Sequence, residues 1–308
     1  MKQLSDHKRK LRLLFWESTI KCNLSCAHCR RVEDDGAVDS DLTTAQAQDL
    51  IEQLAQVGQA QEFMPILVFS GGEPLCRNDI FELIDYAVAK GVKPALATNG
   101  TLIDKAIAAR VKAAGVERVS VSLDGATGEI HNKLRKLEGS FEAAVNGIGY
   151  LRQCGVPFQI NMTVTRHNAH QLDDIFVLAE QLGAVAVHLF MLVPVGCGEE
   201  FAAEDMLSAD EYEQLLERIA KKEHTGRLEV KVTCGPHYER VVREQKLDSS
   251  PAEHPAQNQC PGGHPGGKHG PMSKGCLAGS GGLFVGHSGQ VFPFGYLPGD
   301  CGNNLQMP

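Results

Sequence analysis

Residues 13–29 read Leu-Leu-Phe-Trp-Glu-Ser-Thr-Ile-Lys-Cys-Asn-Leu-Ser-Cys-Ala-His-Cys, a short apolar run that leads into three closely spaced cysteines. Three and two residues separate Cys22, Cys26 and Cys29, so one loop can point their sulfurs at a common centre. A tetrahedral zinc ion or a cubane iron–sulfur cluster normally takes four protein ligands, whereas this loop offers three. Three thiolates on a four-iron cluster leave one iron with an open coordination position, where a metal site can do chemistry. A structural zinc loop with a distant fourth ligand is the alternative.

Apolar strands and amphipathic helices alternate as far as about residue 200. We expect strands at residues 13–17, 66–70, 94–98, 119–123, 158–164 and 186–193, and helices at residues 43–57, 78–90, 102–114, 140–154 and 171–182. Continuous apolar strands that alternate with helices are typical of a parallel sheet covered by helices. Six such units favour an α/β fold with a partial (β/α)6 TIM-like barrel over a doubly wound sheet. In such barrels the functional loops gather at the carboxyl ends of the strands.

The pattern changes after Gly196. We expect a helix at residues 208–222, a short strand at 228–233, a helix at 236–246 and a β-hairpin at 283–297. Residues 251–270 are rich in Pro, Gly and His, which is typical of a loop. The predicted organisation is a flexible leader at residues 1–12, a core barrel at 13–200 and a small α+β C-terminal extension at 201–308.

Composition and charge narrow the class of protein. The chain of 308 residues has a formal net charge of −8, which argues against a nucleic-acid partner. Met1–Arg12 is polar and basic, unlike a secretory signal, and no apolar run reaches the length of a membrane span. The ten cysteines of such a chain favour metal binding over disulfides. We therefore expect a cytoplasmic protein without a membrane partner.

Glycine-rich and polar motifs follow several of the predicted strands. Gly71-Gly72-Glu73-Pro74 follows the second strand, and small residues there let the backbone approach a ligand closely. Ser122 and Asp124 end the fourth strand, where hydroxyl and carboxylate oxygens can bind ribose hydroxyls. Asn99 and Asn161 also lie at or near strand ends. The structural alternatives are ordinary turns and buried asparagines that serve the backbone.

The C-x3-C-x2-C loop resembles that of the radical S-adenosylmethionine (SAM) enzymes. Gly71–Pro74, Thr98–Gly100 and Ser122–Gly125 match further motifs of that family in the same order. The resemblance implies that Cys22, Cys26 and Cys29 hold a [4Fe-4S] cluster and that SAM chelates the open iron. It implies a SAM site made of Gly71, Gly72, Glu73, Pro74, Asn99, Ser122, Asp124, Arg135 and Asn161.

Individual roles in that site follow from the same resemblance. Glu73 would accept a hydrogen bond from the amino group of SAM, and Ser122 and Asp124 would bind its ribose. Arg135 would pair with the SAM carboxylate in the bidentate way that a guanidinium favours, although a solvated helical arginine is an equal alternative. No catalytic side chain is assigned.

Later segments resemble the anaerobic heme synthases of the AhbD type, which group with the SPASM enzymes. These segments are His188–Pro194, Thr233–Tyr238 and Asp300–Asn303. The resemblance implies a porphyrin substrate, iron-coproporphyrin III, whose propionates are oxidatively decarboxylated to vinyl groups to give heme b. Arg166 and Lys231 are candidate partners for the propionates. A flavodoxin- or ferredoxin-like protein would supply electrons.

The motif for a second, auxiliary iron–sulfur cluster is incomplete. Cys276 and Gly289 fit the pattern of the SPASM-type enzymes, but Phe294 and Leu283 stand where their relatives carry cysteine. Cys276 and Cys301, with Cys260 or Cys234, are the remaining candidate ligands of a truncated SPASM/twitch-like site.

Two other functions remain open. One is a peptide-modifying SPASM-type maturase, and the other is a non-catalytic iron–sulfur electron-transfer or binding protein. His28, His131, His188, His237 and His287 are scattered, and we expect them to be structural. The tract with His254, Cys260, His264 and His269 has metal-binding composition, but a loop is the favoured interpretation.

Overall fold

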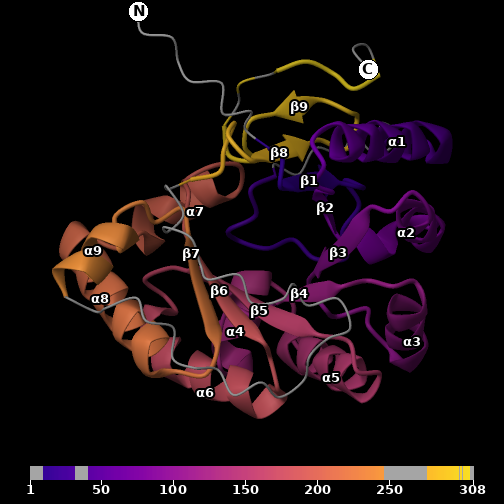
Figure 1. Cartoon of the computed structure of the whole chain (residues 1–308). Helices are drawn as coiled ribbons and strands as arrows, with labels where there is room; N and C mark the ends of the chain where they lie inside the picture. The colour runs from indigo at the N-terminus through magenta and orange to yellow at the C-terminus, as the bar shows by residue number, and fades with distance from the viewer. Residues whose placement is uncertain (1–9, 32–40, 246–275, 298, 300, 306–308) are drawn as a thin grey trace, which may run out of the picture.

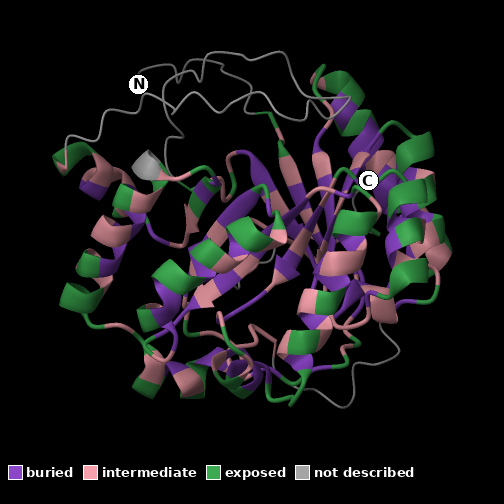
Figure 2. Ribbon diagram, turned by 90° about the horizontal axis from the view of Figure 1, so that it is seen from below, coloured by how far each residue is buried: buried purple, intermediate pink, exposed green. Residues whose placement is uncertain are grey.

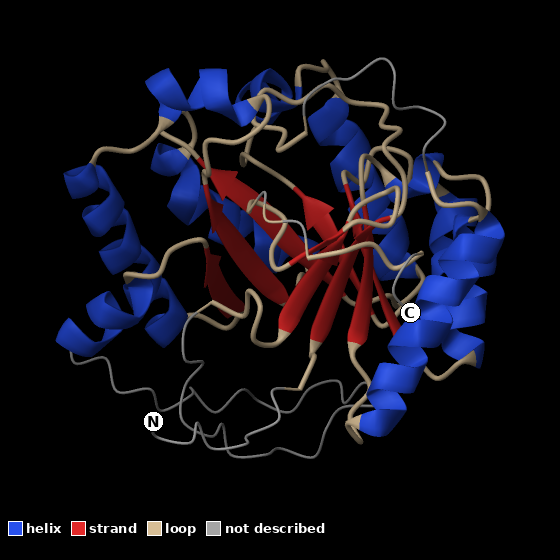
Figure 3. Ribbon diagram, turned by 90° about the horizontal axis from the view of Figure 1, so that it is seen from above, coloured by secondary structure: helices blue, strands red, loops and turns tan. Residues whose placement is uncertain are grey.

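The structure is a computed structural model that describes residues 10–31, 41–245, 276–297, 299 and 301–305. A nine-stranded sheet forms its centre, in the order β7-β6-β5-β4-β3-β2-β1-β8-β9. Figure 1 shows helices around the outside of this curved sheet, and Figure 3 shows the same arrangement from above.

The bounds of the elements agree closely with the predicted ones in the first 200 residues. The strands are β1 (Leu13–Glu17), β2 (Ile66–Ser70), β3 (Lys93–Thr98), β4 (Arg118–Ser122), β5 (Phe158–Val164), β6 (Ala186–Met191), β7 (Glu229–Thr233), β8 (Gly282–Val285) and β9 (Val291–Phe292). The helices are α1 (Thr44–Ala60), α2 (Ile80–Ala89), α3 (Lys105–Ala113), α4 (Gly128–Arg135), α5 (Ser140–Gln153), α6 (Leu172–Leu182), α7 (Gly198–Asp205), α8 (Ala209–Thr225) and α9 (Tyr238–Glu244). Strands β1 to β6 are parallel neighbours in chain order, which confirms the predicted α/β fold.

The core lies between the sheet and its helices. Val121, Ile160 and Val187 are neighbours in register on β4, β5 and β6, and each is fully buried. Trp16 and Phe69 are likewise paired on β1 and β2, with ring centroids 5.7 Å apart. Figure 2 shows buried residues in the strands and exposed residues on the outer helix surfaces. Because side chains alternate along a strand, the other face of β4–β6 is turned to the inside of the curve.

Segments beyond residue 200 extend the sheet at both edges. Strand β7 adds parallel to β6, and β8 adds parallel to β1. Strand β9 then pairs antiparallel with β8, which confirms the predicted hairpin in shorter form. The division of the chain at residue 200 stays a prediction.

Two helices, α4 and α7, are absent from the predicted elements. Each has eight residues, about two turns, which is too short for a hydrophobic period to show in the sequence. The first helix begins next to the expected residue 43, where Thr43 and Gln46 form a capping box. The predicted loop at residues 251–270 lies outside the described residues. None of the described helices is both long and apolar enough to cross a bilayer.

Replacing Ile160 with Ala tests the buried face of the sheet. Ile160 is fully buried, so the substitution should lower the free energy of unfolding by about 2–5 kcal/mol in urea titrations. Val177→Ala on α6 is the matched control, because Val177 is 51% exposed and its loss should cost no more than about 0.5 kcal/mol. Equal effects of the two substitutions would contradict this packing.

Candidate functional site

The loop that carries the three cysteines lies directly against the Gly71-Gly72 turn. Gly72 N donates to Thr19 O at 2.8 Å, and Glu73 N donates to Lys21 O at 2.8 Å. A Cβ on Gly72 would lie 2.2 Å from Lys21 O, and Gly71 has a φ of +141°. The two glycines therefore make room for the backbone of the cysteine loop. Their own carbonyl oxygens accept no hydrogen bond within the described structure, so they stay available to a ligand.

Glu73 is fully buried and joins the ends of β2 and β3. Its carboxylate accepts hydrogen bonds from Thr98 Oγ1 and Asn99 N, each at 2.7 Å, and from Leu75 N at 3.2 Å. Burial raises the pKa of Glu73 to about 7. We expected this carboxylate to accept from the amino group of SAM. In the structure both oxygens bind groups of the protein, where Glu73 shapes the turn, and its contact with the amino group of SAM stays a prediction. Pro74, also buried, begins the short helical turn Pro74–Cys76 that follows.

Asn99 ties the end of β3 to the cysteine loop. Its Oδ1 accepts from Thr101 N at 2.9 Å, and its Nδ2 donates to Asn23 Oδ1 at 2.8 Å. This geometry matches the alternative of a buried asparagine that serves the protein. Asn99 thus contacts Asn23, one residue after Cys22, and its predicted contact with a ligand stays a prediction.

Asp124 is a fully buried carboxylate at the end of β4. Its Oδ2 lies 2.7 Å from Arg135 Nη2 on α4 and 3.3 Å from His28 Nε2 on the cysteine loop. Its Oδ1 accepts from Thr163 N at 2.8 Å. Burial favours protonation of Asp124, but Arg135, His28, His131 and the hydrogen bond from Thr163 N together hold the pKa of Asp124 below its usual value. Because Arg135 N–H groups do not point straight at Oδ2, the contact is an ion pair rather than an aligned hydrogen bond.

This ion pair joins two of the residues that were predicted to contact SAM. Asp124 is fully buried and Arg135 is 9% exposed, and their contacts with SAM stay predictions. Arg135 also places Nη1 at 3.6 Å from the Sγ of Cys26, so its charge acts on a thiol of the loop. The pKa of Arg135 is raised because Asp124 and Cys26 outweigh the effect of its burial.

The three thiols lie on the loop that follows β1, near one another but not gathered at one centre. Burial raises the pKa of Cys22 to about 11, and it also raises that of Cys26, against the influence of Arg135. Cys22 and Cys29 are both within electrostatic reach of Cys26. Within the described ranges, no three His, Cys, Asp or Glu side chains converge as a metal site. A metal must therefore displace protons from these thiols and draw them together.

Ser122 and Asn161 stand side by side on the inner face of β4 and β5. They are partners in register, and both side chains are half-buried. The Ser122 hydroxyl makes no hydrogen bond to other described residues, while Asn161 Oδ1 accepts from Gln159 Nε2 at 2.9 Å. Their contacts with SAM stay predictions.

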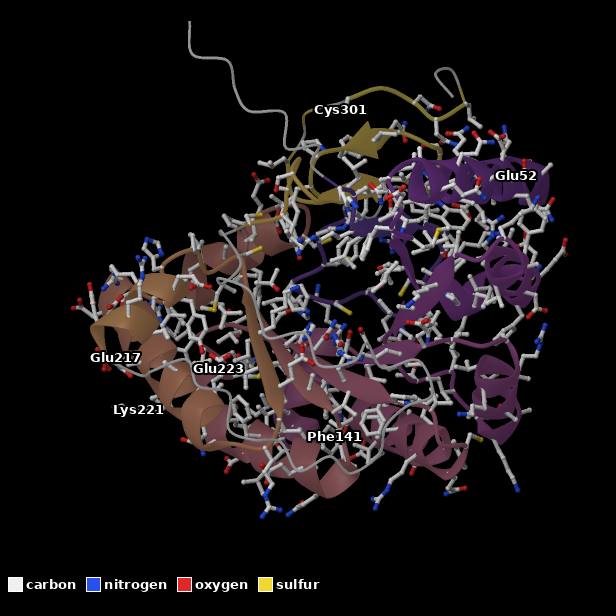
Figure 4. The ribbon with its side chains drawn as sticks, viewed as in Figure 1. Glu52, Phe141, Glu217, Lys221, Glu223 and Cys301 are labelled. Carbon is white, nitrogen blue, oxygen red and sulfur yellow. The ribbon has the colours of Figure 1, made fainter. Side chains whose placement is uncertain are left out.

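Cys276 and Cys301, the described candidates for the auxiliary cluster, do not belong to any metal-binding group among the described residues. Cys276 and Cys301 are both exposed, and Cys301 lies on the loop beyond β9 (Figure 4). Cys276 is instead close enough to Cys234 for their charges to interact. Cys260 and the histidines near it lie outside the described residues. A second cluster therefore stays a prediction.

Sequence reasoning missed a buried acid at the start of the cysteine loop. Glu17, 6% exposed, accepts from Arg30 Nη2 at 2.7 Å and lies 3.3 Å from His287 Nδ1. Arg30 also donates to Gly295 O at 3.3 Å, and its guanidinium lies 4.2 Å from the centroid of the Phe284 ring. These contacts tie the end of the cysteine loop to the C-terminal hairpin. The sequence did offer a signal, because Glu17 is a charged residue at the end of an otherwise apolar strand.

Replacing Asp124 with Asn should destabilise the protein strongly. The change leaves the buried Arg135 without its counter-charge, which should cost about 3–5 kcal/mol of unfolding free energy in urea titrations. Asp85→Asn is the control, because it breaks the exposed Arg110–Asp85 pair and should cost at most about 1 kcal/mol. If Asp124→Asn lowered the free energy of unfolding no more than Asp85→Asn does, the Asp124–Arg135 pair would not hold the central position given to it here.

The raised pKa of Glu73 predicts a specific dependence of stability on pH. Between its ordinary value of 4.5 and its folded value of about 7, the folded chain binds more protons than the unfolded chain, so stability falls as pH rises. The contribution amounts to about 3 kcal/mol over this window. In Glu73→Gln, the free energy of unfolding should vary less between pH 5 and pH 7.5 than in the wild type. Parallel pH profiles of the two proteins would count against a protonated Glu73.

Comparisons with known proteins identify the family of the chain. Residues 16–179 match the Radical SAM superfamily. The chain is 40% identical over 305 residues to the AdoMet-dependent heme synthase of Nitratidesulfovibrio vulgaris, with 99% of this chain and 79% of the relative covered. It is 41% identical over 301 residues to the AdoMet-dependent heme synthase of Methanosarcina barkeri, with 96% and 80% covered.

A solved structure shares the fold. Streptococcus suis SuiB bound to S-adenosylmethionine superposes with a TM-score of 0.69 over 97% of this chain, at 16% sequence identity. The chain spans 64% of SuiB, and at this identity the likeness concerns the fold alone. Together these matches imply a [4Fe-4S] cluster and SAM as cofactors. The chain is therefore an enzyme that belongs to the radical SAM superfamily, and within it the chain groups with the AdoMet-dependent heme synthases.

Proposed function

We propose that this enzyme converts two propionates of iron-coproporphyrin III to vinyl groups and so produces heme b. The observation that carries the proposal is the identity of about 40% to two AdoMet-dependent heme synthases over nearly the whole chain. In each conversion a propionate loses one hydrogen atom, CO2 and one electron, and a carbon–carbon double bond forms. The enzyme must therefore hold a porphyrin, remove the hydrogen atom and pass on the electron.

Cys22, Cys26 and Cys29 are the proposed ligands of the cluster. They lie on a loop of eight residues, within electrostatic reach of one another, and the loop is fixed at both ends by Glu17 and by the Gly71-Gly72 turn. Arg135 stands 3.6 Å from Cys26, where its charge favours the thiolate that binds iron. A [4Fe-4S] cluster fits this donor set with one iron left for SAM.

The carbonyl oxygens of Gly71 and Gly72 and the hydroxyl of Ser122 are the proposed contacts for SAM. They lie at the carboxyl ends of β2 and β4, and none makes a hydrogen bond within the described structure. The two carbonyls can accept from an ammonium group, and the hydroxyl can bind a ribose. When bound, the cluster and SAM together supply a carbon-centred radical that can remove a hydrogen atom from a propionate carbon.

The buried groups around the site keep it in shape. Asp124 neutralises Arg135, so the cation stands beside Cys26 without drawing in a SAM or substrate carboxylate of its own. Glu73 and Asn99 join the ends of β2 and β3 to each other and to the cysteine loop. These positions are pre-organised, which limits the ordering that ligand binding would otherwise require.

The proposed reaction also needs an acceptor for the electron released with CO2 and a donor that reduces the first cluster. A second cluster near Cys276 and Cys234 could take the electron released with CO2, and a flavodoxin- or ferredoxin-like protein could reduce the first. The cytoplasmic location remains a prediction as well. A peptide-modifying maturase is less well supported, because the likeness to SuiB rests on fold at 16% identity. A non-catalytic carrier would have no use for the open carbonyls of Gly71 and Gly72.

Reconstitution tests the function directly. The anaerobically loaded wild-type enzyme, given SAM, a reductant and iron-coproporphyrin III, should release 5′-deoxyadenosine and heme b, detected by chromatography and mass spectrometry. Omission of SAM is the control. Absence of both products from an enzyme with a full cluster would reject the assignment.

Iron content tests the cluster ligands separately from turnover. The wild-type chain should bind about four irons with one cluster, or about eight with two. Cys22→Ala, Cys26→Ala and Cys29→Ala should each lose about four of these. Cys154→Ala, a half-buried cysteine at the end of α5, is the matched control and should keep the full content. Unchanged iron in the three loop variants would remove the basis of the proposed site.

A further inference from the structure

A row of polar side chains crosses the inner face of the sheet from β4 to β7. Ser122 pairs with Asn161, Asn161 with His188, and His188 with Lys231. Partners in register on parallel strands project from the same face. The residues before them on each strand, Val121, Ile160, Val187 and Val230, are buried on the helix side. The row therefore faces the inside of the curved sheet and continues the wall that begins at the proposed SAM site.

An ion pair lies on the same inner face, nearer the start of the strands. Arg118 Nη1 lies 3.4 Å from Glu229 Oε2 and 3.5 Å from Gln159 Oε1. Arg118 is on β4 and Glu229 on β7, with β5 and β6 between them in the sheet. A contact over two intervening strands requires the inner face to be concave. Arg118 is thereby partnered, whereas Lys231 has no ionic or hydrogen-bonding partner among the described residues.

His188 places an unsatisfied donor beside Lys231. Its Nδ1 is 2.8 Å from Gln159 Nε2, an N–H donor, so the ring proton resides on Nε2. Nε2 is buried and has no hydrogen-bond partner in the described structure. Burial, followed by the charges of Lys231 and Arg118, lowers the pKa of His188 to about 3, so the ring is neutral near pH 7. A buried donor without an acceptor is costly. The neighbouring Lys231 is exposed and brings a positive charge to the same place, so an anion there would meet both groups.

We infer that His188 and Lys231 form a carboxylate subsite, which binds a propionate of the porphyrin substrate; this rests on the proposed function. A carboxylate supplies both the acceptor for His188 Nε2 and the counter-charge for Lys231. The chain carries a net charge of −8, so a tetra-anionic porphyrin needs a local cation to bind. Two arginines near the site are already paired, Arg135 with Asp124 and Arg30 with Glu17.

Arg166, the other residue predicted to meet a propionate, is also engaged elsewhere. Its Nη1 donates to Glu204 O at 3.0 Å, and its Nη2 donates to Glu211 Oε2 at 3.2 Å. Both contacts direct it to α7 and α8, whereas Lys231 has no such partner among the described residues, so the inference rests on Lys231. Lys231 is three strand spacings from Ser122, roughly 14 Å along the sheet. A propionate held there is remote from SAM, so it is not the one under attack in that orientation.

Equilibrium binding of two iron porphyrins, followed by their Soret bands without SAM or reductant, tests the subsite. Iron-coproporphyrin III has four propionates, and iron-mesoporphyrin IX keeps only the two that survive in heme. Lys231→Met and His188→Leu should each weaken binding of iron-coproporphyrin III by about ten-fold or more. Lys231→Arg should keep affinity within about three-fold. Lys105→Met on the outer helix α3 is the control for net charge and should have no effect.

The two porphyrins show which propionate is held. Equal weakening of both by Lys231→Met assigns a propionate that is retained in heme, whereas weakening for iron-coproporphyrin III alone assigns one that reacts. Unchanged affinity for both porphyrins in Lys231→Met and His188→Leu would overturn the subsite while leaving the proposed function intact. Failure of the wild-type enzyme to bind either porphyrin would instead overturn the proposed function.

Discussion

A single buried negative charge, on Asp124, organises the end of the sheet where the chemistry is proposed. It faces Arg135 on α4, His28 on the cysteine loop and the backbone of β5. A carboxylate in a dry environment is stable only if it is paired and hydrogen-bonded, so each of these elements has one acceptable position relative to β4. Arg135, once fixed, reaches Cys26. The ionisation of Cys26 thus depends on the Asp124–Arg135 pair, whose members lie on other elements.

Close backbone contact provides a second constraint on the same loop. The absence of side chains at Gly71 and Gly72 lets the second strand end press against residues Thr19–Lys21, and Asn99 reaches Asn23 from the third. The ends of four neighbouring strands are therefore connected through the cysteine loop. Such a loop can lose protons and gather its sulfurs around iron without a large rearrangement of the sheet. The buried Glu73 lowers the stability of the fold as pH rises, because its ionised form is unfavourable in a buried position.

The sequence predicted the fold well because the evidence is local. Apolar strands and helical periods gave β1 to β6, and the motifs at their ends gave the cysteine loop and the strand ends around it. It could not predict the contacts of Glu73, Asp124, Arg135 and Arg166 within the protein, because those contacts are made with residues far along the chain. Asp124 and Thr163, for example, are 39 residues apart. The row from Ser122 to Lys231 was equally hidden, since it exists only through the register of four strands. The short helices α4 and α7 lacked enough turns to show a period.

The central claim is that a cluster on Cys22, Cys26 and Cys29 keeps one iron open for SAM. Electron paramagnetic resonance of the dithionite-reduced, reconstituted enzyme tests it most directly. The account predicts that SAM changes the g-values of the reduced cluster in the wild type, and that Cys26→Ala lacks this SAM-sensitive signal. A cluster spectrum that SAM leaves unmoved, in an enzyme with about four irons per chain, would contradict it.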